Sequence, residues 1–182
     1  MYQRLLLAAG TVLIIWASGK PLRDPRCHGF YRCFAWELIL LQVVVNLPCW
    51  FDDPFPLHQI VSWLLLCASL YPAVAAWSLF RRLGGPARRA IHPTNYAFEN
   101  TSRLIMIGIF RYIRHPMYCS LLLLLWGAFF KSPSWIGAGI SLLGTTFLTV
   151  TAKVEERENV QTFGDDYRAY MGKSKMFVPF VL

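Results

Sequence analysis

The sequence predicts an all-α integral membrane protein with about five transmembrane helices, a C-terminal helical hairpin and short cytoplasmic tail helices. Hydrophobic residues make up 55% of the 182-residue chain and charged residues only 15%, with a mean hydropathy of +0.40. An ordinary soluble domain is about 45–50% apolar. The charged residues also gather between apolar segments, which is the pattern of membrane topology. Length and composition therefore favour a single membrane domain, 1–182.

Five apolar segments are candidates for the spans. A spanning helix needs about 17–25 apolar residues, and the third and fifth segments fit this length well. The other three are short and require tilt or interfacial ends. The first three spans, within 1–80, are expected to form the substrate side, and 81–182 is expected to hold the cofactor-binding loop, the hairpin and the tail. The five segments are 3–19, 34–51, 58–80, 116–131 and 134–152.

The charges between the spans predict the orientation. The linkers 20–33 and 81–115 and the tail after residue 152 are rich in Lys and Arg, whereas the link 52–57 carries two aspartates and no basic residue. Basic regions next to spans tend to face the cytoplasm. The N-terminus is therefore expected outside and the C-terminus inside, in a bacterial inner membrane.

The link between the fourth and fifth spans predicts which distant residues meet. Only residues 131–134 join the two spans. So short a link requires an antiparallel helical hairpin. The start of the fourth span and the end of the fifth must then lie at the same face. This places Arg114 and His115 near Glu155 and Glu156, about 40 residues later in the chain.

The tail is predicted to form two short helices. Residues 154–162 are expected to continue the fifth span, and Gly164 to end that helix. Asp165 is then expected to cap a second helix over 166–171. An apolar face at helical spacing is expected to pack back on the membrane domain; it consists of Val160, Phe163, Tyr167, Tyr170 and Met171.

The two charged clusters have both a simple and a chemical interpretation. Arg and Tyr near span ends are common interface anchors, and acids in a tail can simply be solvated. Alternatively, Arg114, His115 and the free N–H groups of the helix that begins at Pro116 form a site for a carboxylate or phosphate. Glu155 and Glu156 then suit an amine, a sulfonium or hydroxyls. S-adenosylmethionine satisfies both clusters, as do nucleotides and zwitterionic lipid headgroups.

Two segments carry a resemblance to a known family. GIFRYIRHPMY (108–118), the hairpin and EERENVQTFGDDYRAYMGKSKMFVPF (155–180) resemble the isoprenylcysteine carboxyl methyltransferase / phospholipid methyltransferase family of integral membrane enzymes, as a bacterial-type member. The resemblance covers about 95–180. It implies an S-adenosylmethionine-dependent methyltransferase with its active site at the cytoplasmic face. The residues that it assigns to cofactor binding are Gly108, Tyr112, Arg114, His115, Pro116, Tyr118, Glu155, Glu156 and Tyr167.

The reaction and the acceptor are predicted less sharply than the cofactor. Methyl transfer from a sulfonium mainly requires alignment and water exclusion. An amine or thiol acceptor also needs a base, for which Glu156 is the first candidate and His115 the second. Carboxyl methyltransferases of this family carry an arginine about one turn before the two glutamates, where this chain has Thr151-Ala152-Lys153. A phospholipid amine, an isoprenoid-type carboxylate and a small thiol therefore all stay open as lipid-soluble acceptors.

The competing hypothesis is a non-enzymatic protein, such as a small membrane transporter or an assembly factor. Polar groups inside spans often mark translocation paths. Glu37 and Asn46 of the second span are the candidates for such a path.

Two other kinds of partner are not expected. The basic residues do not form the continuous polar surface that nucleic acid would need. Cys27, His28 and Cys33 lack a fourth ligand at a zinc-type spacing, so no metal site is predicted. The expected partners are the lipid bilayer and a lipophilic small-molecule or lipid substrate.

Overall fold

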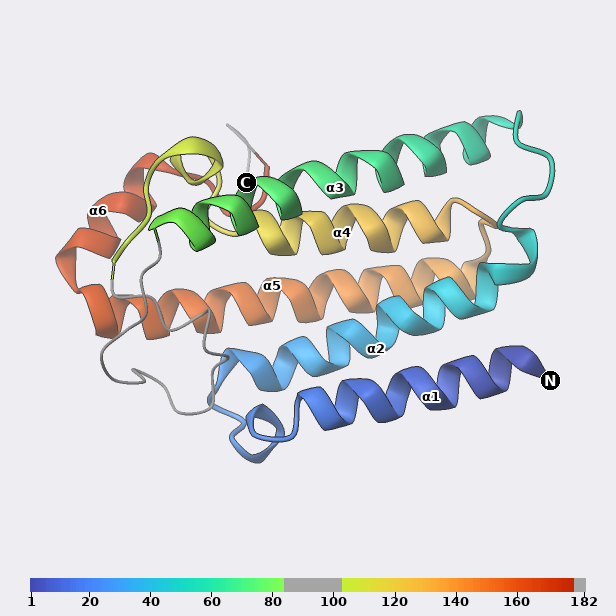
Figure 1. Ribbon diagram of the computed structural model, residues 1–182, viewed down its shortest axis with the longest axis horizontal. Coiled ribbons are helices and arrows are strands. Elements are labelled where there is room, and N and C mark those ends of the chain that lie inside the picture. Colours follow the sequence, from blue (N-terminus) through green and yellow to red (C-terminus); the bar gives the residue numbers. More distant parts are fainter. Residues whose placement is uncertain (84–102, 179–182) are drawn as a thin grey trace.

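The computed structural model describes residues 1–83 and 103–178, and these residues form a bundle of helices without a β-strand. Helices α1 to α5 run side by side along the longest axis of the molecule, and the short helix α6 lies at one end (Figure 1). Each of the five predicted apolar segments is one of the long helices. The helices are α1 (Tyr2–Ala17), α2 (His28–Asn46), α3 (Leu57–Leu83), α4 (Pro116–Phe129), α5 (Trp135–Phe163) and α6 (Asp165–Lys173), with 3-10 turns η1 (Pro21–Arg23), η2 (Leu47–Cys49) and η3 (Gly108–Arg111).

Within the described residues, three helical segments are long and apolar enough to cross a membrane. They are α2 with its extension η2, which together cover His28–Cys49, and the helices α3 and α5. Helices α1 and α4 are apolar but shorter, at 16 and 14 residues. The prediction of an all-α membrane fold is therefore confirmed. Of the three segments predicted to be short, the first and the fourth are short helices, whereas the second belongs to a 22-residue segment.

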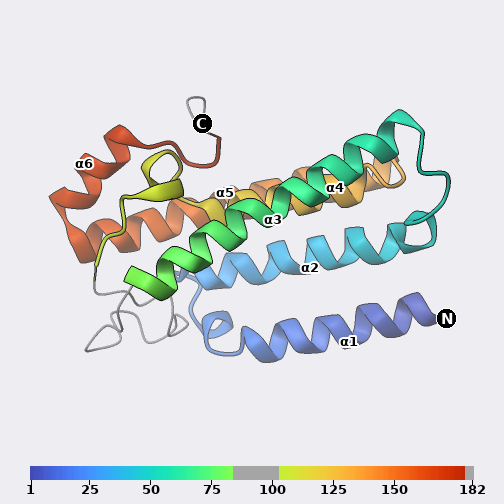
Figure 2. The same cartoon turned by 45° about the horizontal axis from the view of Figure 1, so that its top comes forward.

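The helices alternate in direction, so the connections separate into two ends. Figures 1 and 2 place Met1, the α2–α3 link and the α4–α5 link at one end of the bundle. The α1–α2 link, the segment 103–115 and α6 lie at the other end, which we call the site end. The predicted hairpin of α4 and α5 is confirmed, and the start of α4 lies at the same end as the last turns of α5.

Helix α2 begins at His28, several residues before the span predicted from residue 34. Cys27 acts as the N-cap, and its sulfur accepts a hydrogen bond from the amide of Gly29. The backbone amide of His28 donates to Glu158 Oε1 at 2.9 Å, which ties this end of α2 to α5. Arg32 therefore lies on a helix and is buried, with 5% of its surface exposed, instead of in the cytoplasmic linker that the charge pattern predicted.

The polar residues of the predicted translocation path join helices to one another. Glu37 Oε2 accepts a hydrogen bond from the Thr11 hydroxyl at 3.0 Å, which links α2 to α1. Asn46 Nδ2 donates to the carbonyl oxygen of Ala128 at 2.7 Å, which links α2 to the end of α4. Both residues therefore have a structural use in the packing of the bundle.

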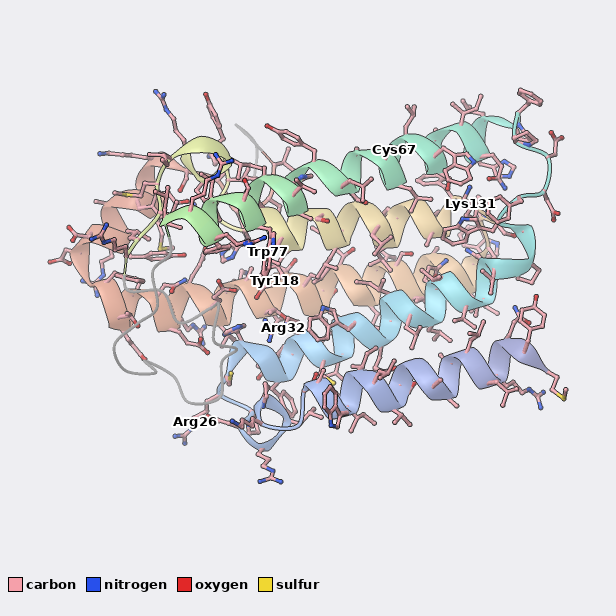
Figure 3. All side chains as sticks on the ribbon, in the orientation of Figure 1. Arg26, Arg32, Cys67, Trp77, Tyr118 and Lys131 are labelled. Carbon is pink, nitrogen blue, oxygen red and sulfur yellow. The ribbon has the colours of Figure 1, made fainter. Side chains whose placement is uncertain are left out.

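Lys131 closes the hairpin at the end away from the site, as Figure 3 shows. Its side chain is 1% exposed. The Lys131 ammonium donates to Gln59 Oε1 at 3.0 Å and lies 3.5 Å from the ring centre of Trp63. A hydrogen bond and a cation–π contact of this kind offset the loss of water around a buried ammonium.

The tail differs in one detail from its prediction. Helix α5 ends at Phe163, and Gly164 follows with a φ of 60°, a conformation that favours glycine. Gly164 is itself the N-cap of α6, and Asp165 is the first residue of that helix, so the prediction of Asp165 as the cap is wrong. The Asp165 carboxylate instead accepts from Arg168 Nη1 at 2.8 Å. Arg88 and Arg89 of the predicted basic linker lie outside the described residues.

Candidate active site

A cavity of about 260 Å³ lies at the site end of the bundle, among α2, α3, α4, α5, α6 and the segment 103–118. Six of the nine residues predicted to bind a cofactor line it: Arg114, His115, Pro116, Tyr118, Glu155 and Tyr167. The other three predicted residues, Gly108, Tyr112 and Glu156, do not line it. The rest of its wall is formed by Arg32, Trp36, Ala73, Phe80, Arg103, Leu104, Ile105, Phe110, Met117, Ser120, Leu121, Asn159, Phe163 and Tyr170.

His115 lies between the two adjacent glutamates. Its Nε2 is 3.4 Å from Glu156 Oε1 and its Nδ1 is 3.9 Å from Glu155 Oε2. The imidazole is stacked on the Tyr118 ring, with 5.4 Å between the centroids. Only 2% of the His115 side chain is exposed. The hairpin thus brings together the two charged clusters that are about 40 residues apart in the sequence, as predicted.

Arg114 and Glu156 form an ion pair that points into the protein. Arg114 Nε donates to Glu156 Oε1 at 2.7 Å, and the two side chains are 10% and 9% exposed. Arg114 Nη1 also donates to the carbonyl oxygens of Met171 and Ser174. Arg114 therefore joins α4, α5 and the tail, and these donors are engaged by protein groups instead of a ligand.

Glu155 is the glutamate that lines the cavity. Adjacent residues of a helix point in different directions, so Glu155 faces the cavity while Glu156 faces Arg114. Glu155 Oε2 accepts a hydrogen bond from the Tyr118 hydroxyl at 2.5 Å, and 30% of its side chain is exposed. The Glu155 carboxylate is therefore the one that a ligand in the cavity can reach.

A short strap of the tail, residues 174–177, fixes the approach to α4. Two backbone amides ahead of the helix donate to it, Arg114 to the carbonyl of Lys175 at 2.7 Å and His115 to the carbonyl of Met176 at 3.1 Å. The amide of Lys175 donates in return to the carbonyl of Tyr112 at 2.9 Å. Phe177 is buried, and its ring lies 6.2 Å from that of His115. The strap thus fixes the position of the His115 backbone.

Two tyrosines of α6 cover the cavity. The Tyr170 hydroxyl donates to the carbonyl of Phe110 at 2.6 Å, and Tyr167 is 2% exposed and its hydroxyl accepts from Asn159 Nδ2 at 3.4 Å. Burial raises the pKa of Tyr170 to about 12. Burial, together with the charge of Glu155, also raises the pKa of Tyr167. Both hydroxyls therefore stay protonated at neutral pH.

Alkaline pH is expected to destabilise the protein above about pH 10. An unfolded tyrosine ionises near pH ~10, whereas the folded pKa values of Tyr167 and Tyr170 are raised. Their contribution to the free energy of unfolding is therefore fully present below the unfolded pKa and is lost as pH rises through the folded pKa. The unfolding temperature in detergent, measured at increasing pH, should fall in this range. The unfolding temperature of the variant with both tyrosines changed to Phe should fall less steeply with pH. An equally steep fall would show that these two tyrosines do not cause the alkaline destabilisation.

Gly108 and Tyr112 have structural roles outside the cavity. Gly108 has a φ of 61°, and a Cβ at this position would lie 2.8 Å from Leu79 Cδ1, so the turn into η3 needs glycine. The turn directs Phe110 into a small core with Ala76 and Ile105. Tyr112 is 48% exposed, and its backbone pairs with the strap. Their predicted contact with a cofactor stays a prediction.

Few features of the sequence pointed to the part of the cavity lining that comes from α2 and α3. Arg32 and Trp36 come from α2, and Ala73 and Phe80 come from α3. Arg32 and Trp36 are four residues apart and therefore share a helix face; the Arg32 guanidinium lies 5.0 Å from the Trp36 ring centre. The spacing of four residues was visible in the sequence. Because the predicted span began at residue 34, however, Arg32 was not expected to lie on the same helix as Trp36. Figure 3 shows Arg32 and Tyr118 in the half of the bundle opposite Lys131.

One cluster of possible metal ligands lies next to Arg32. Cys27, His28 and Glu158 place one ligand atom each within 4.8 Å of one another. Glu158 thus takes the place in which the sequence suggested Cys33. His28 Nδ1 and Glu158 Oε2 are 2.7 Å apart, whereas two ligands of one tetrahedral zinc lie about 3.3 Å apart. The cluster is therefore arranged as a hydrogen-bonded pair that joins α2 to α5.

Comparison with known proteins identifies the family. The model of a family described as phospholipid methyltransferase matches residues 64–166, more than half of the chain. The chain belongs to the phospholipid methyltransferase family. The matched range contains α4, α5 and both charged clusters, so the resemblance predicted from the sequence is confirmed.

A more distant relative comes from Bradyrhizobium diazoefficiens and is named methanethiol S-methyltransferase 1. It is 27% identical over 71 residues, which are 39% of this chain and 24% of that protein, so the match spans only about a quarter of the relative's length. No solved structure matches the chain. The family and the relative's name both indicate a methyltransferase.

Proposed function

We propose that this member of the phospholipid methyltransferase family is an S-adenosylmethionine-dependent enzyme that methylates a lipid-soluble acceptor. The observation that supports this most is the mixed lining of the cavity at the site end of the bundle. It contains ionic side chains of both signs, among them Arg103 and Glu155, together with apolar side chains such as Trp36, Ala73 and Leu121. A water-soluble, zwitterionic donor and a lipophilic acceptor need both kinds of lining. In this proposal the site end faces the cytoplasm and the N-terminus lies outside.

The ionic and aromatic residues of the lining fit the chemical groups of the cofactor. Bound S-adenosylmethionine supplies an electrophilic methyl group on a sulfonium. Glu155 is a carboxylate that faces the cavity and can accept from an amine or from ribose hydroxyls. Phe163 and Tyr167 add aromatic surface for a purine. Pro116 starts α4, where its missing N–H costs nothing, and the N-terminus of a helix favours a negatively charged group.

His115 is our candidate for the proton acceptor, and Glu156 for the residue that positions it. Glu156 does not line the cavity and lies 3.4 Å from His115 Nε2, so it acts on an acceptor only through the imidazole. This reverses the order of the two candidates taken from the sequence. An amine or thiol acceptor loses a proton and needs this base. A carboxylate acceptor does not.

The acceptor is expected to enter laterally from the bilayer and to rest against the apolar part of the lining. Trp36 lies one turn deeper in α2 than Arg32, and Leu121 lies more than one turn beyond His115 along α4. The methanethiol named for the Bradyrhizobium relative supports a small thiol as one candidate. The family description supports a phospholipid amine as another. An isoprenoid-type carboxylate is the third.

Binding of S-adenosylhomocysteine tests the proposal directly. Purified protein in detergent is titrated with this product by calorimetry, with the Glu155→Gln variant beside the wild type. Binding by the wild type and weaker binding by the variant are expected. Methyl-labelled S-adenosylmethionine, incubated with phosphatidylethanolamine, a prenylated cysteine or an alkanethiol, then identifies the acceptor. A well-folded wild type that gives no heat of binding would refute the cofactor assignment.

A further inference from the structure

The cofactor carries a carboxylate, and the residue that the sequence assigned to it is engaged elsewhere. Arg114 donates from Nε to Glu156 and from Nη1 to two carbonyls of the tail. Two further arginines line the cavity, Arg32 on α2 and Arg103 at the start of the segment that leads to η3. One of these is therefore expected to receive the carboxylate.

Arg32 contacts side chains of its own helix. It is buried on α2, and its guanidinium lies 5.0 Å from the ring centre of Trp36. Its Nη1 is also 3.5 Å from His28 Nε2, next to the pair that joins α2 to α5. These contacts direct the Arg32 charge toward the helix packing.

Arg103 differs from both of the other arginines. It is exposed, and its guanidinium forms no hydrogen bond or ion pair with residues 1–83 or 103–178. Two residues later Ile105 is 8% exposed and packs with Ala76 and Phe110, which anchors the backbone to α3. Arg103 is thus held at the wall of the cavity with its donors available. A guanidinium binds a carboxylate through two parallel hydrogen bonds.

We propose that Arg103 binds the carboxylate of S-adenosylmethionine, the role that the sequence suggested for Arg114. The inference rests on the proposed function. It assigns different roles to Arg103 and Arg114, which both precede α4 in the sequence. Arg114 stabilises the joint of α4, α5 and the tail, and Arg103 recognises the ligand.

A pair of ligands that differ only in the carboxylate tests this role. S-adenosylhomocysteine contains the group, and its decarboxylated analogue, S-adenosyl-3-thiopropylamine, keeps the nucleoside, the sulfur and the amine. Both are titrated by calorimetry into wild type, Arg103→Gln and Arg111→Gln. Arg111 is a matched control, because it is exposed, lies eight residues away and does not line the cavity.

The expected result is specific to one ligand and one arginine. Arg103→Gln should lower the affinity for S-adenosylhomocysteine by about 10- to 100-fold, the range for losing a hydrogen bond to a charged group. It should leave the analogue's affinity unchanged, and Arg111→Gln should change neither. Arg103→Lys, which keeps the charge, should recover part of the loss.

Three outcomes would overturn the role of Arg103. Equal weakening of both ligands by Arg103→Gln would indicate a general effect on the cavity, and unchanged affinity for both would show that another group binds the carboxylate. Equal weakening by Arg111→Gln would indicate only a long-range charge effect. A folded wild type that binds neither ligand would instead refute the proposed function itself, so the two failures are distinguishable.

Discussion

Replacing Arg114 with alanine is expected to lower the free energy of unfolding by about 3–5 kcal/mol, the range for breaking a buried ion pair by removing one partner. The Glu156 carboxylate, 9% exposed, would lose the guanidinium that lies 2.7 Å away. The carbonyls of Met171 and Ser174 would lose a donor at the same time. The measurement is reversible denaturation in detergent micelles, or the unfolding temperature where unfolding is irreversible.

The control for this prediction is Arg111→Ala. Arg111 is exposed, and substitutions at such sites usually stay within about 0.5 kcal/mol. The double variant Arg114→Met with Glu156→Gln removes both charges and should recover much of the loss, because replacing a whole buried pair by neutral groups is often nearly neutral. If Arg114→Ala were as stable as Arg111→Ala, the ion pair would not be the joint of α4, α5 and the tail that its geometry indicates.

The strap and the ion pair converge on the same short stretch of backbone. Arg114 and His115 are held through their amides by residues 174–177 and through the Arg114 side chain by Glu156. His115 is therefore placed by contacts from three parts of the chain that are far apart in sequence. A group that must meet an acceptor in a fixed geometry benefits from such support, since misplacement by about 1 Å can cost about 100-fold in rate.

The features that the sequence predicted well depend on chain connectivity and local pattern. The link of residues 131–134 is too short for anything but a hairpin, so the proximity of His115 and the two glutamates followed without a structure. The apolar runs likewise predicted all five long helices. The end of α5 was predicted from the glycine at position 164, and the structure shows that Gly164 has a positive φ.

The features that it missed depend on long-range contacts. Helix α2 starts at His28 because Glu158, 130 residues later, accepts from its amide and ring. The choice of Glu155 over Glu156 as the cavity-facing acid depends on how α5 is rotated, which no local pattern gives. The strap at 174–177 is held mainly by backbone hydrogen bonds, which leave no signature in residue types. Arg103 was counted only as one more basic residue of a linker.

His115→Ala is expected to reduce methyl transfer to an amine or thiol acceptor by about 100- to 10,000-fold, the usual contribution of a positioned general base. The imidazole lines the cavity and is oriented by Glu156, whose Oε1 lies 3.4 Å from its Nε2. Initial rates at saturating S-adenosylmethionine measure the effect. Calorimetry with S-adenosylhomocysteine on the same preparation separates a loss of chemistry from a loss of binding.

A histidine at the other end of the bundle supplies the control. His58 lies in the first turn of α3, so His58→Ala should leave the rate unchanged. The prediction also depends on the acceptor. A carboxylate has no proton to lose, so the rate of its methylation by His115→Ala should fall only as far as ligand binding is weakened. If His115→Ala methylated a thiol or an amine at the wild-type rate, the proton would have to leave by another route. Glu155, the cavity-facing carboxylate that accepts from Tyr118, would then be the group to test.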